Sequence, residues 1–340
     1  MPKTRLRIGY CTENLGLQEK GVRTSKTARL ATVKKLGKKY ALELSLSNLE
    51  GTLEVLKWNA EHGITFYRIS SMICPHITNP ALLSASDRKN YKALAYSVKP
   101  LAGICRKIGE VVRKYNMRVN FHPDPFISLG TENPDLLIRN TRELWFHATI
   151  LDMMGVDLNC IICIHGGGFY NNKPNTMVRW VRNFNSLPIK IKRRIGIEND
   201  EFSYSVQDMF WISSQVKPFP LEFRGSSWKP SKRYKIPVIF DIFHYYCYNK
   251  TVELRELARQ WDLEKIIPIW LKTWGNRNPH GHISEQKKDG PRGAHAKYVR
   301  NIPIELREIP EKYGKNVDLQ IEAKAKEKAY FYLKKKYGLY

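Results

Sequence analysis

Eight side chains of metal-binding type recur along the chain, each at or soon after the end of a short apolar run. Six of them end or directly follow such a run: His122, His165, Glu198, Asp241, His282 and Glu322. Two more histidines, His244 and His295, stand further on, in segments that could fold back over the same place. Imidazole and carboxylate groups in this ratio suit Zn²⁺ or Mn²⁺ better than Ca²⁺ or a thiolate-selected ion. These residues therefore predict a site for divalent metal ions.

Paired ions would give this site a particular chemistry. Two divalent ions about 3.5 to 4 Å apart suit phosphate ester hydrolysis, because one polarises the phosphoryl oxygen while a bridging water supplies hydroxide. A carboxylate such as Glu198 can bridge two ions, and neutral imidazoles can take the outer positions. We expect two bound ions, Mn²⁺ foremost, with Zn²⁺, Mg²⁺ or Co²⁺ as alternatives. The other histidines, His62, His76 and His147, stand in helix or loop contexts and are predicted to be structural.

The charge balance indicates the class of partner. Lysine and arginine number 57 against 32 acidic residues, a formal net charge of +25 over 340 residues. So large an excess favours a polyanion or an anionic membrane surface, and nucleic acid fits it better. No stretch approaches the ~18 to 20 continuous apolar residues of a membrane helix, and the opening MPKTRLRIGY lacks a signal-peptide core. The sequence therefore predicts a cytoplasmic, nucleoid-associated protein without membrane contact, acting as a monomer.

The elements that must position these residues alternate between short apolar strands and longer helices. The clearest helical segments are 45–62, 95–115 and 134–154. Eight strand candidates lie at 6–10, 64–69, 118–121, 160–164, 194–197, 237–240, 281–284 and 317–321. Repeated strand–helix units imply a parallel sheet, and eight of them in this length favour a closed (β/α)8 barrel. We expect a single TIM-barrel domain over residues 1–340, with the metal site at the C-terminal mouth.

One segment interrupts this alternation. Residues 218–235 combine Pro, Gly and Ser with Trp228, Tyr234 and five basic residues, which predicts a basic functional loop or insertion.

Sulfur-containing side chains are expected to stay off the metal. Cys160 and Cys163 form a CxxC pair inside an apolar run that predicts a buried strand rather than a zinc-binding turn. Their odd spacing points the two sulfurs to opposite faces of the strand, so the pair is predicted to be structural. Met72 is expected near the metal centre without binding it, since a thioether is a poor ligand for Mn²⁺.

Nine short motifs together resemble the UV damage endonucleases, in the order in which that family carries them. They are residues 7–15 (RIGYCTENL), 66–71 (FYRISS), 121–123 (FHP), 164–167 (IHGG), 197–200 (IEND), 241–244 (DIFH), 282–284 (HIS), 293–295 (GAH) and 321–324 (IEAK). Members of this family are TIM barrels related to endonuclease IV. They cut the phosphodiester directly 5′ of cyclobutane dimers, 6-4 photoproducts and some abasic sites, leaving 3′-hydroxyl and 5′-phosphate ends. The resemblance implies a metal-dependent DNA repair endonuclease acting on double-stranded DNA with UV lesions.

The resemblance also implies roles for the metal-site residues. The ligands implied for the first ion are His122, His165 and Glu198, and those for the second are Glu198, Asp241, His282 and Glu322. The residues implied to be catalytic are Glu198, Glu322 and Lys324. A third ion at His244 and His295 stays open, because Gly293 stands where endonuclease IV supplies an aspartate. His280 likewise stands where some relatives carry a modified lysine.

A further set of residues would contact DNA by the same resemblance. Relatives wedge a Gln-Tyr pair into the duplex, and here Pro125 and Phe126 take that place, which leaves Phe126 to stack. Tyr10 and Asn14 resemble residues that line the pocket for the extruded nucleotides. The basic residues expected at the DNA are Arg68, Lys229 and Lys326.

Two alternatives from other classes remain. A sugar isomerase of the xylose isomerase type also uses a barrel with His, Glu and Asp around two ions, but a small sugar needs no surface of +25. A basic barrel that binds damaged DNA without cutting it is the second alternative, and replacing Glu198 would then leave its function intact.

Overall fold

Eight parallel strands form one sheet in the computed structural model, which describes residues 5–220, 233–249 and 260–339. The order of the strands is β3-β2-β1-β10-β9-β8-β5-β4. A parallel bridge between Phe121 and Ile162 joins the two outermost strands. Their bounds are β1 Leu6–Cys11, β2 Phe66–Arg68, β3 Arg118–Asn120, β4 Ile162–His165, β5 Ile195–Glu198, β8 Val238–Asp241, β9 His280–Ile283 and β10 Val317–Ile321. The sheet therefore closes into the predicted (β/α)8 barrel, and each strand candidate from the sequence corresponds to one observed strand.

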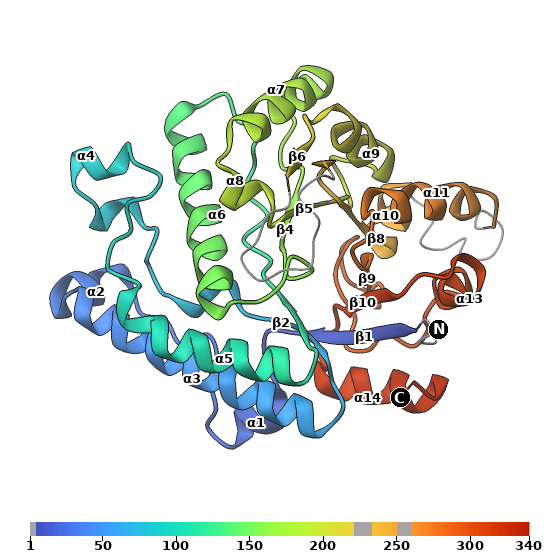
Figure 1. Ribbon diagram of the computed structural model, residues 1–340, viewed down its shortest axis with the longest axis horizontal. Helices are drawn as coiled ribbons and strands as arrows, with labels where there is room; N and C mark the ends of the chain where they lie inside the picture. The colour runs from blue at the N-terminus through green and yellow to red at the C-terminus, as the bar shows by residue number, and fades with distance from the viewer. Residues whose placement is uncertain (1–4, 221–232, 250–259, 340) are drawn as a thin grey trace.

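Helices surround this barrel and connect successive strands (Figure 1). The longer ones are α3 Lys38–Glu61, α5 Ala102–Lys114, α6 Pro134–Met154, α7 Lys173–Ser186, α9 Val206–Gln215, α11 Gln260–Thr273 and α14 Glu327–Tyr337. The shorter ones are α1 Leu15–Glu19, α2 Leu30–Leu36, α4 Ala85–Arg88, α8 Ile189–Lys192, α10 Ile242–Tyr248, α12 Ile304–Arg307 and α13 Ile309–Tyr313, with single 3-10 turns at Ser71–Ile73, Pro80–Leu82 and Lys99–Leu101. None of the described helices is long and apolar enough to cross a membrane.

Local sequence signals explain where these helices begin and end. Helix α6 starts after Asn133, whose side chain accepts hydrogen bonds from two backbone N–H groups of the first turn, with Pro134 at the first helical position. It ends at Gly155, which adopts the left-handed conformation that glycine tolerates best. At α9, Ser205 and Asp208 form a reciprocal capping box. These caps fix the lengths of the helices and so the points at which the following strands start.

The described ends of the interrupting segment pair with each other between α9 and β8. Strands β6 (Phe219–Pro220) and β7 (Arg233–Tyr234) are antiparallel and form a separate two-stranded sheet. Residues 221–232, and with them Lys229, lie outside the described residues. The described part thus fits an insertion into the strand–helix order.

Candidate metal centre

Strand ends bring the predicted metal ligands together. Glu198 and His165 are paired in register as the last residues of neighbouring β5 and β4, and Asp241 pairs with His282 across β8 and β9. Glu322 comes directly after β10, and His122 is the second residue after β3. Because parallel strands of a barrel point the same way, all of these residues lie at one mouth.

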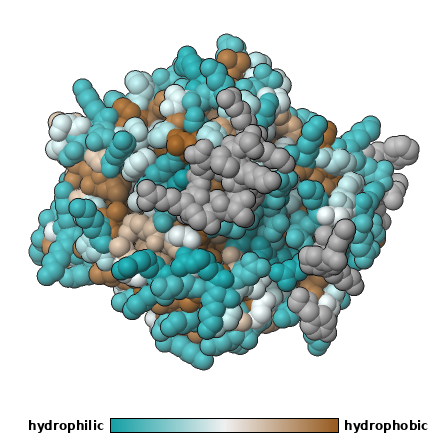
Figure 2. All heavy atoms as spheres, in the orientation of Figure 1, coloured by the Kyte–Doolittle hydropathy of each residue, from teal (hydrophilic) through white to brown (hydrophobic). Residues whose placement is uncertain are grey.

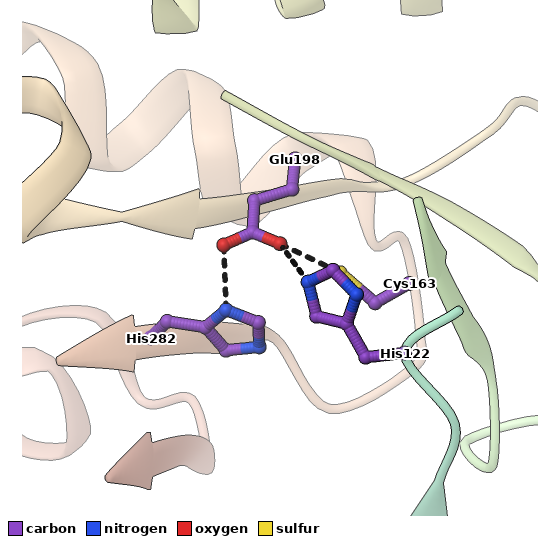
Figure 3. Close-up of side chains that lie close together, drawn as sticks. All are labelled: His122, Cys163, Glu198 and His282. Carbon is purple, nitrogen blue, oxygen red and sulfur yellow. Dashed lines mark hydrogen bonds and ion pairs between the residues drawn. The ribbon is translucent and has the colours of Figure 1, made fainter. Parts of the chain in front are cut away.

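Glu198 lies at the middle of this group (Figure 3). Its Oε2 is 2.9 Å from His122 Nε2, and its Oε1 is 2.6 Å from His282 Nδ1. Cys163 donates its S–H to the same Oε2 at 2.8 Å. The carboxylate is fully buried, so it is held by side chains on both of its oxygens without exposure to solvent.

Two more carboxylates face the same histidines. His282 Nδ1 is 3.5 Å from Glu322 Oε1 and 3.9 Å from Asp241 Oδ2. His244 Nδ1 lies 3.7 Å from Asp241 Oδ2 and 3.6 Å from Glu198 Oε1. Three negative groups therefore converge on one buried point, which is costly unless positive charge compensates them.

The remaining two histidines lie at the rim of this group. His165 Nε2 is 3.8 Å from Glu198 Oε2, and His295 Nδ1 is 3.6 Å from Glu322 Oε2. His165 is buried, whereas His295 is half-buried on its loop. The structure thus brings all eight predicted metal-binding residues to one place.

The donor set fits divalent metal ions. Three overlapping groups have their donor atoms within 4.8 Å of one another: His122, Cys163, Glu198 and His282; Glu198, Asp241 and His244; and Asp241, His282 and Glu322. Across the described part of the chain, three buried atoms of the centre find no hydrogen-bond partner, namely Asp241 Oδ2, His165 Nδ1 and His282 Nε2. Buried polar atoms normally have hydrogen-bond partners. Polar atoms that lack such partners beside converging carboxylates are therefore expected where a metal ion binds.

The local electrostatics favour ligand-ready protonation states at His165 and Glu198, whereas, against the effect of burial, nearby Asp241 and Glu198 raise the pKa of His244 to about 10. Burial lowers the pKa of His165 to about 3, which keeps its imidazole neutral. Burial alone would raise the pKa of Glu198, but the nearby His282 and His165 and two imidazole hydrogen bonds hold that pKa well below its usual value. An ionised carboxylate beside a neutral imidazole is the form in which both bind a metal.

An open cavity of about 1290 Å³ lies over this centre. Its lining includes His122, His165, His244, His295 and Glu322 from the centre itself. Met72 also lines it and is 53% exposed, so the structure places this side chain in the cavity of the metal centre. The cavity has room for a substrate much larger than a water molecule.

The residues predicted to contact DNA divide into two groups. Arg68, Pro125 and Phe126 line the cavity, and Arg68 forms an ion pair with Glu322. Tyr10 and Asn14 do not line it. The Tyr10 hydroxyl donates to Asn59 Oδ1 at 2.6 Å, and Asn14 caps the first turn of α1. Both are buried, so in this structure they hold the loop after β1 rather than face a ligand.

The two predicted lysines in the described part of the chain differ in their relation to the cavity. Lys326 Nζ donates to Thr12 Oγ1 at 3.2 Å, and Thr12 lines the cavity. Lys324 is exposed and is not among the cavity-lining residues, so the structure leaves its predicted catalytic role without a contact to the centre.

The three histidines predicted to be structural each contact a backbone carbonyl. His62 Nδ1 lies 2.7 Å from Trp58 O, His76 Nε2 lies 2.7 Å from Ala28 O, and His147 Nδ1 lies 3.0 Å from Glu143 O. None of them belongs to the three donor groups found among the described residues.

Sequence reasoning missed two residues of the centre. Cys163 was expected to be structural, and its sulfur does point away from that of Cys160, but it points to Glu198. Its spacing of two from His165 was a usable signal, because such residues share one face of a strand. Glu201 lies 3.8 Å from His244 through its Oε2, on a loop whose path no local pattern predicts.

The exposed Phe126 provides a first mutational prediction. It is 85% exposed on the loop after β3, with its backbone N–H held by Asp124 Oδ1. If its ring stacks on a base, Phe126→Ala should remove about 1–3 kcal/mol, a roughly 5- to 150-fold loss of affinity for damaged duplex. Fluorescence anisotropy with a dimer-containing duplex measures this loss.

A matched control is Tyr115→Ala. Tyr115 is another exposed aromatic residue, but it follows α5 at the opposite end of the barrel. Equal affinities of Phe126→Ala and Tyr115→Ala would contradict a role for Phe126 in binding.

Comparisons with known proteins agree with this geometry. The model of the UV-endonuclease UvdE family matches residues 6–224 and 229–340. A mimivirus protein named for UV-damage endonuclease activity is 32% identical, over 97% of this chain and 90% of its own length. The UV DNA damage endonuclease of Bacillus mycoides (strain KBAB4) is 30% identical over 95% of this chain and 92% of its own. The crystal structure of SacUVDE superimposes with a TM-score of 0.75 at 27% identity and covers 99% of this chain and 100% of the other. The chain therefore belongs to the UV-endonuclease UvdE family.

Proposed function

We propose that this protein is a DNA repair endonuclease that hydrolyses the phosphodiester directly 5′ of UV photoproducts. Cyclobutane dimers, 6-4 photoproducts and abasic sites are the proposed lesions. The observation that carries the proposal is the convergence of Glu198, Asp241 and Glu322 with five imidazoles beneath an open cavity. Family membership and the names of the relatives support DNA as the substrate.

We propose two divalent ions. His122, His165 and Glu198 would hold one, with Asp241, His282 and Glu322 joining Glu198 around the other. When bound, such ions polarise a phosphoryl oxygen and supply hydroxide near neutral pH. Mn²⁺, Zn²⁺, Mg²⁺ and Co²⁺ are all compatible with imidazole and carboxylate donors.

Glu201 is a candidate carboxylate ligand for a third metal ion. The sequence offered only His244 and His295, because Gly293 stands where an aspartate was expected. A Cβ at Gly293 would lie 3.4 Å from Glu201 Oε1, so the carboxylate of Glu201 occupies the space beside that glycine. Glu201 lies beside His244 as well, and we propose it as the third ligand of this outer position.

The residues around the centre would position the DNA. Arg68 lines the cavity while its guanidinium pairs with Glu322, so it holds that carboxylate and presents positive charge to a phosphate. Lys326 contacts Thr12 through its Nζ. Phe126 would fill the gap that the extruded nucleotides leave in the stack, a few kcal/mol being needed to unstack them.

The surface charge should make binding depend steeply on salt. The face shown in Figure 2 is covered mainly by hydrophilic side chains, in a chain of net charge +25. For roughly six to ten phosphate contacts, raising salt from about 50 to 200 mM should weaken binding by about 10³-fold or more. Anisotropy titrations with damaged and undamaged duplexes should show the same slope, and an affinity independent of salt would contradict the proposed phosphate contacts.

Nucleotide-resolution mapping of the products tests the proposed activity. The purified chain is incubated with Mn²⁺ and a duplex carrying one cyclobutane dimer, beside an undamaged duplex and a chelator-treated sample. We expect one nick directly 5′ of the dimer, with 3′-hydroxyl and 5′-phosphate ends, and none in either control. Tight binding without cleavage under any divalent ion would instead identify a damaged-DNA-binding protein.

A further inference from the structure

The side chain of Cys163 in β4 points in a different direction from that of Cys160, the buried cysteine just before this strand. The Cys163 Sγ points into the barrel and lies 2.8 Å from Glu198 Oε2, the oxygen that also contacts His122 (Figure 3). Cys160, three residues earlier, instead accepts a hydrogen bond from the backbone N–H of Val119 at 3.5 Å. Both are fully buried, so burial alone does not distinguish them. The partner of Cys163 is a residue of the metal centre.

We propose that Cys163 is a sulfur ligand of the ion held by His122, His165 and Glu198, and that it makes this position select Zn²⁺ or Co²⁺ over Mn²⁺. The donor atoms of His122, Cys163 and Glu198 lie within 4.8 Å of one another, and His165 Nε2 is 3.8 Å from Glu198 Oε2, so these side chains are close enough to turn toward one ion. Thiolate is a soft ligand that Zn²⁺ accepts readily and Mn²⁺ does not favour.

Coordination of a metal ion by Cys163 exchanges the bond from its sulfur to hydrogen for a bond to the metal. The S–H bond breaks, a sulfur–metal bond forms, and the proton leaves to solvent, as in other sites where metal binding releases protons. One sulfur, two imidazoles and one carboxylate would complete four donors.

A competing explanation is that Cys163 only orients Glu198 through its S–H group. Cys163→Ser separates the two explanations, because a serine hydroxyl can donate to Glu198 Oε2 but supplies no sulfur. Cys163→Ala removes both functions. Cys160→Ala is the matched control, since it removes a buried sulfur from the same region that points away from the centre.

Cobalt is the probe for this test, used with the full-length chain freed of metal. Bound Co²⁺ should show sulfur-to-cobalt charge-transfer absorption in the near ultraviolet in the wild type and in Cys160→Ala. Both Cys163 variants should lack it while still binding cobalt by elemental analysis. Competition titrations should show a loss of Zn²⁺ affinity in both variants larger than the roughly 10- to 100-fold that follows loss of a residue that only orients a ligand, with a smaller change for Mn²⁺.

Two absorption results would contradict the proposed role of Cys163. Absence of the absorption from cobalt-loaded wild type, or its survival in Cys163→Ser, would overturn the inference. This inference rests on the metal centre of the proposed function, but its readouts are absorption and affinity. A wild type that nicks DNA without the absorption would overturn only the inference, and one that shows the absorption without nicking would overturn only the proposed function.

Discussion

Glu198→Gln is expected to cut dimer-containing duplex about a thousandfold more slowly than the wild type while binding it at least as tightly. The substitution keeps the shape of the side chain but removes the negative charge that two imidazoles contact at 2.9 and 2.6 Å. A site that loses its bridging carboxylate loses several kcal/mol of transition-state stabilisation, and about 4 kcal/mol corresponds to a thousandfold. DNA should bind as well or better, because one negative charge is removed from the buried group beneath the cavity.

Single-turnover cleavage with excess enzyme measures this rate, and anisotropy measures binding on the same samples. Glu110→Gln is the matched control, because it makes the same chemical change on the exposed face of α5. A Glu198→Gln rate within tenfold of the wild type would show that cleavage does not depend on this centre. Retained thermal unfolding behaviour separates lost chemistry from lost structure.

The sequence was sufficient to predict the barrel and the convergence of these side chains, because both depend on periodic features. Strands buried on both faces appear as short apolar runs, and a parallel barrel places all their C-terminal ends at one mouth. Histidine or carboxylate residues at successive strand ends must therefore converge, whatever the loops do. His122 and Glu322 could be assigned in this way although 200 residues separate them in the chain.

Residues on loops were harder to predict, for a physical reason. Glu201 reaches His244 because the turn after β5 is held by Asp200, whose side chain accepts the backbone N–H of Phe202 at 2.8 Å. Such turns depend on tertiary contacts rather than on a repeating pattern. Tyr10 and Asn14 were assigned by resemblance alone, and the structure instead places them in one buried hydrogen-bonded chain with Asn59.

The end of the barrel opposite the metal centre gives a second large expected effect, on stability. Asp318 in β10 is buried between two arginines, with its Oδ1 2.6 Å from Arg7 Nε and its Oδ2 2.8 Å from Arg118 Nη1. Arg118 is itself fully buried, with its guanidinium over the rings of Phe66 and Trp274. The Asp318 carboxylate therefore compensates a charge that cannot reach water.

Asp318→Asn is expected to lower the free energy of unfolding by about 3–5 kcal/mol, because it leaves the buried Arg118 without its counter-charge. Urea unfolding monitored by circular dichroism measures this loss. The matched control is Glu264→Gln, whose partner Lys312 lies 3.7 Å away in a pair more than half exposed on both sides. An exposed pair contributes about 0–1 kcal/mol, so the control should unfold nearly as the wild type does. Equal midpoints for the two variants would contradict this account.

The contribution of Asp318 to the free energy of unfolding should also decrease as the pH falls. Burial alone would raise the pKa of this carboxyl, but Arg7 and Arg118 lower it more, so its folded pKa lies below the usual value. Such a group contributes its full stability above the unfolded pKa of about 3.9, and that contribution is lost as pH falls through the folded pKa. The difference between wild type and Asp318→Asn should therefore be constant near neutral pH and shrink below about pH 4. A difference that grew on acidification would mean that Asp318 is protonated in the folded protein, and the pairing with Arg118 would then not be what stabilises this end of the barrel.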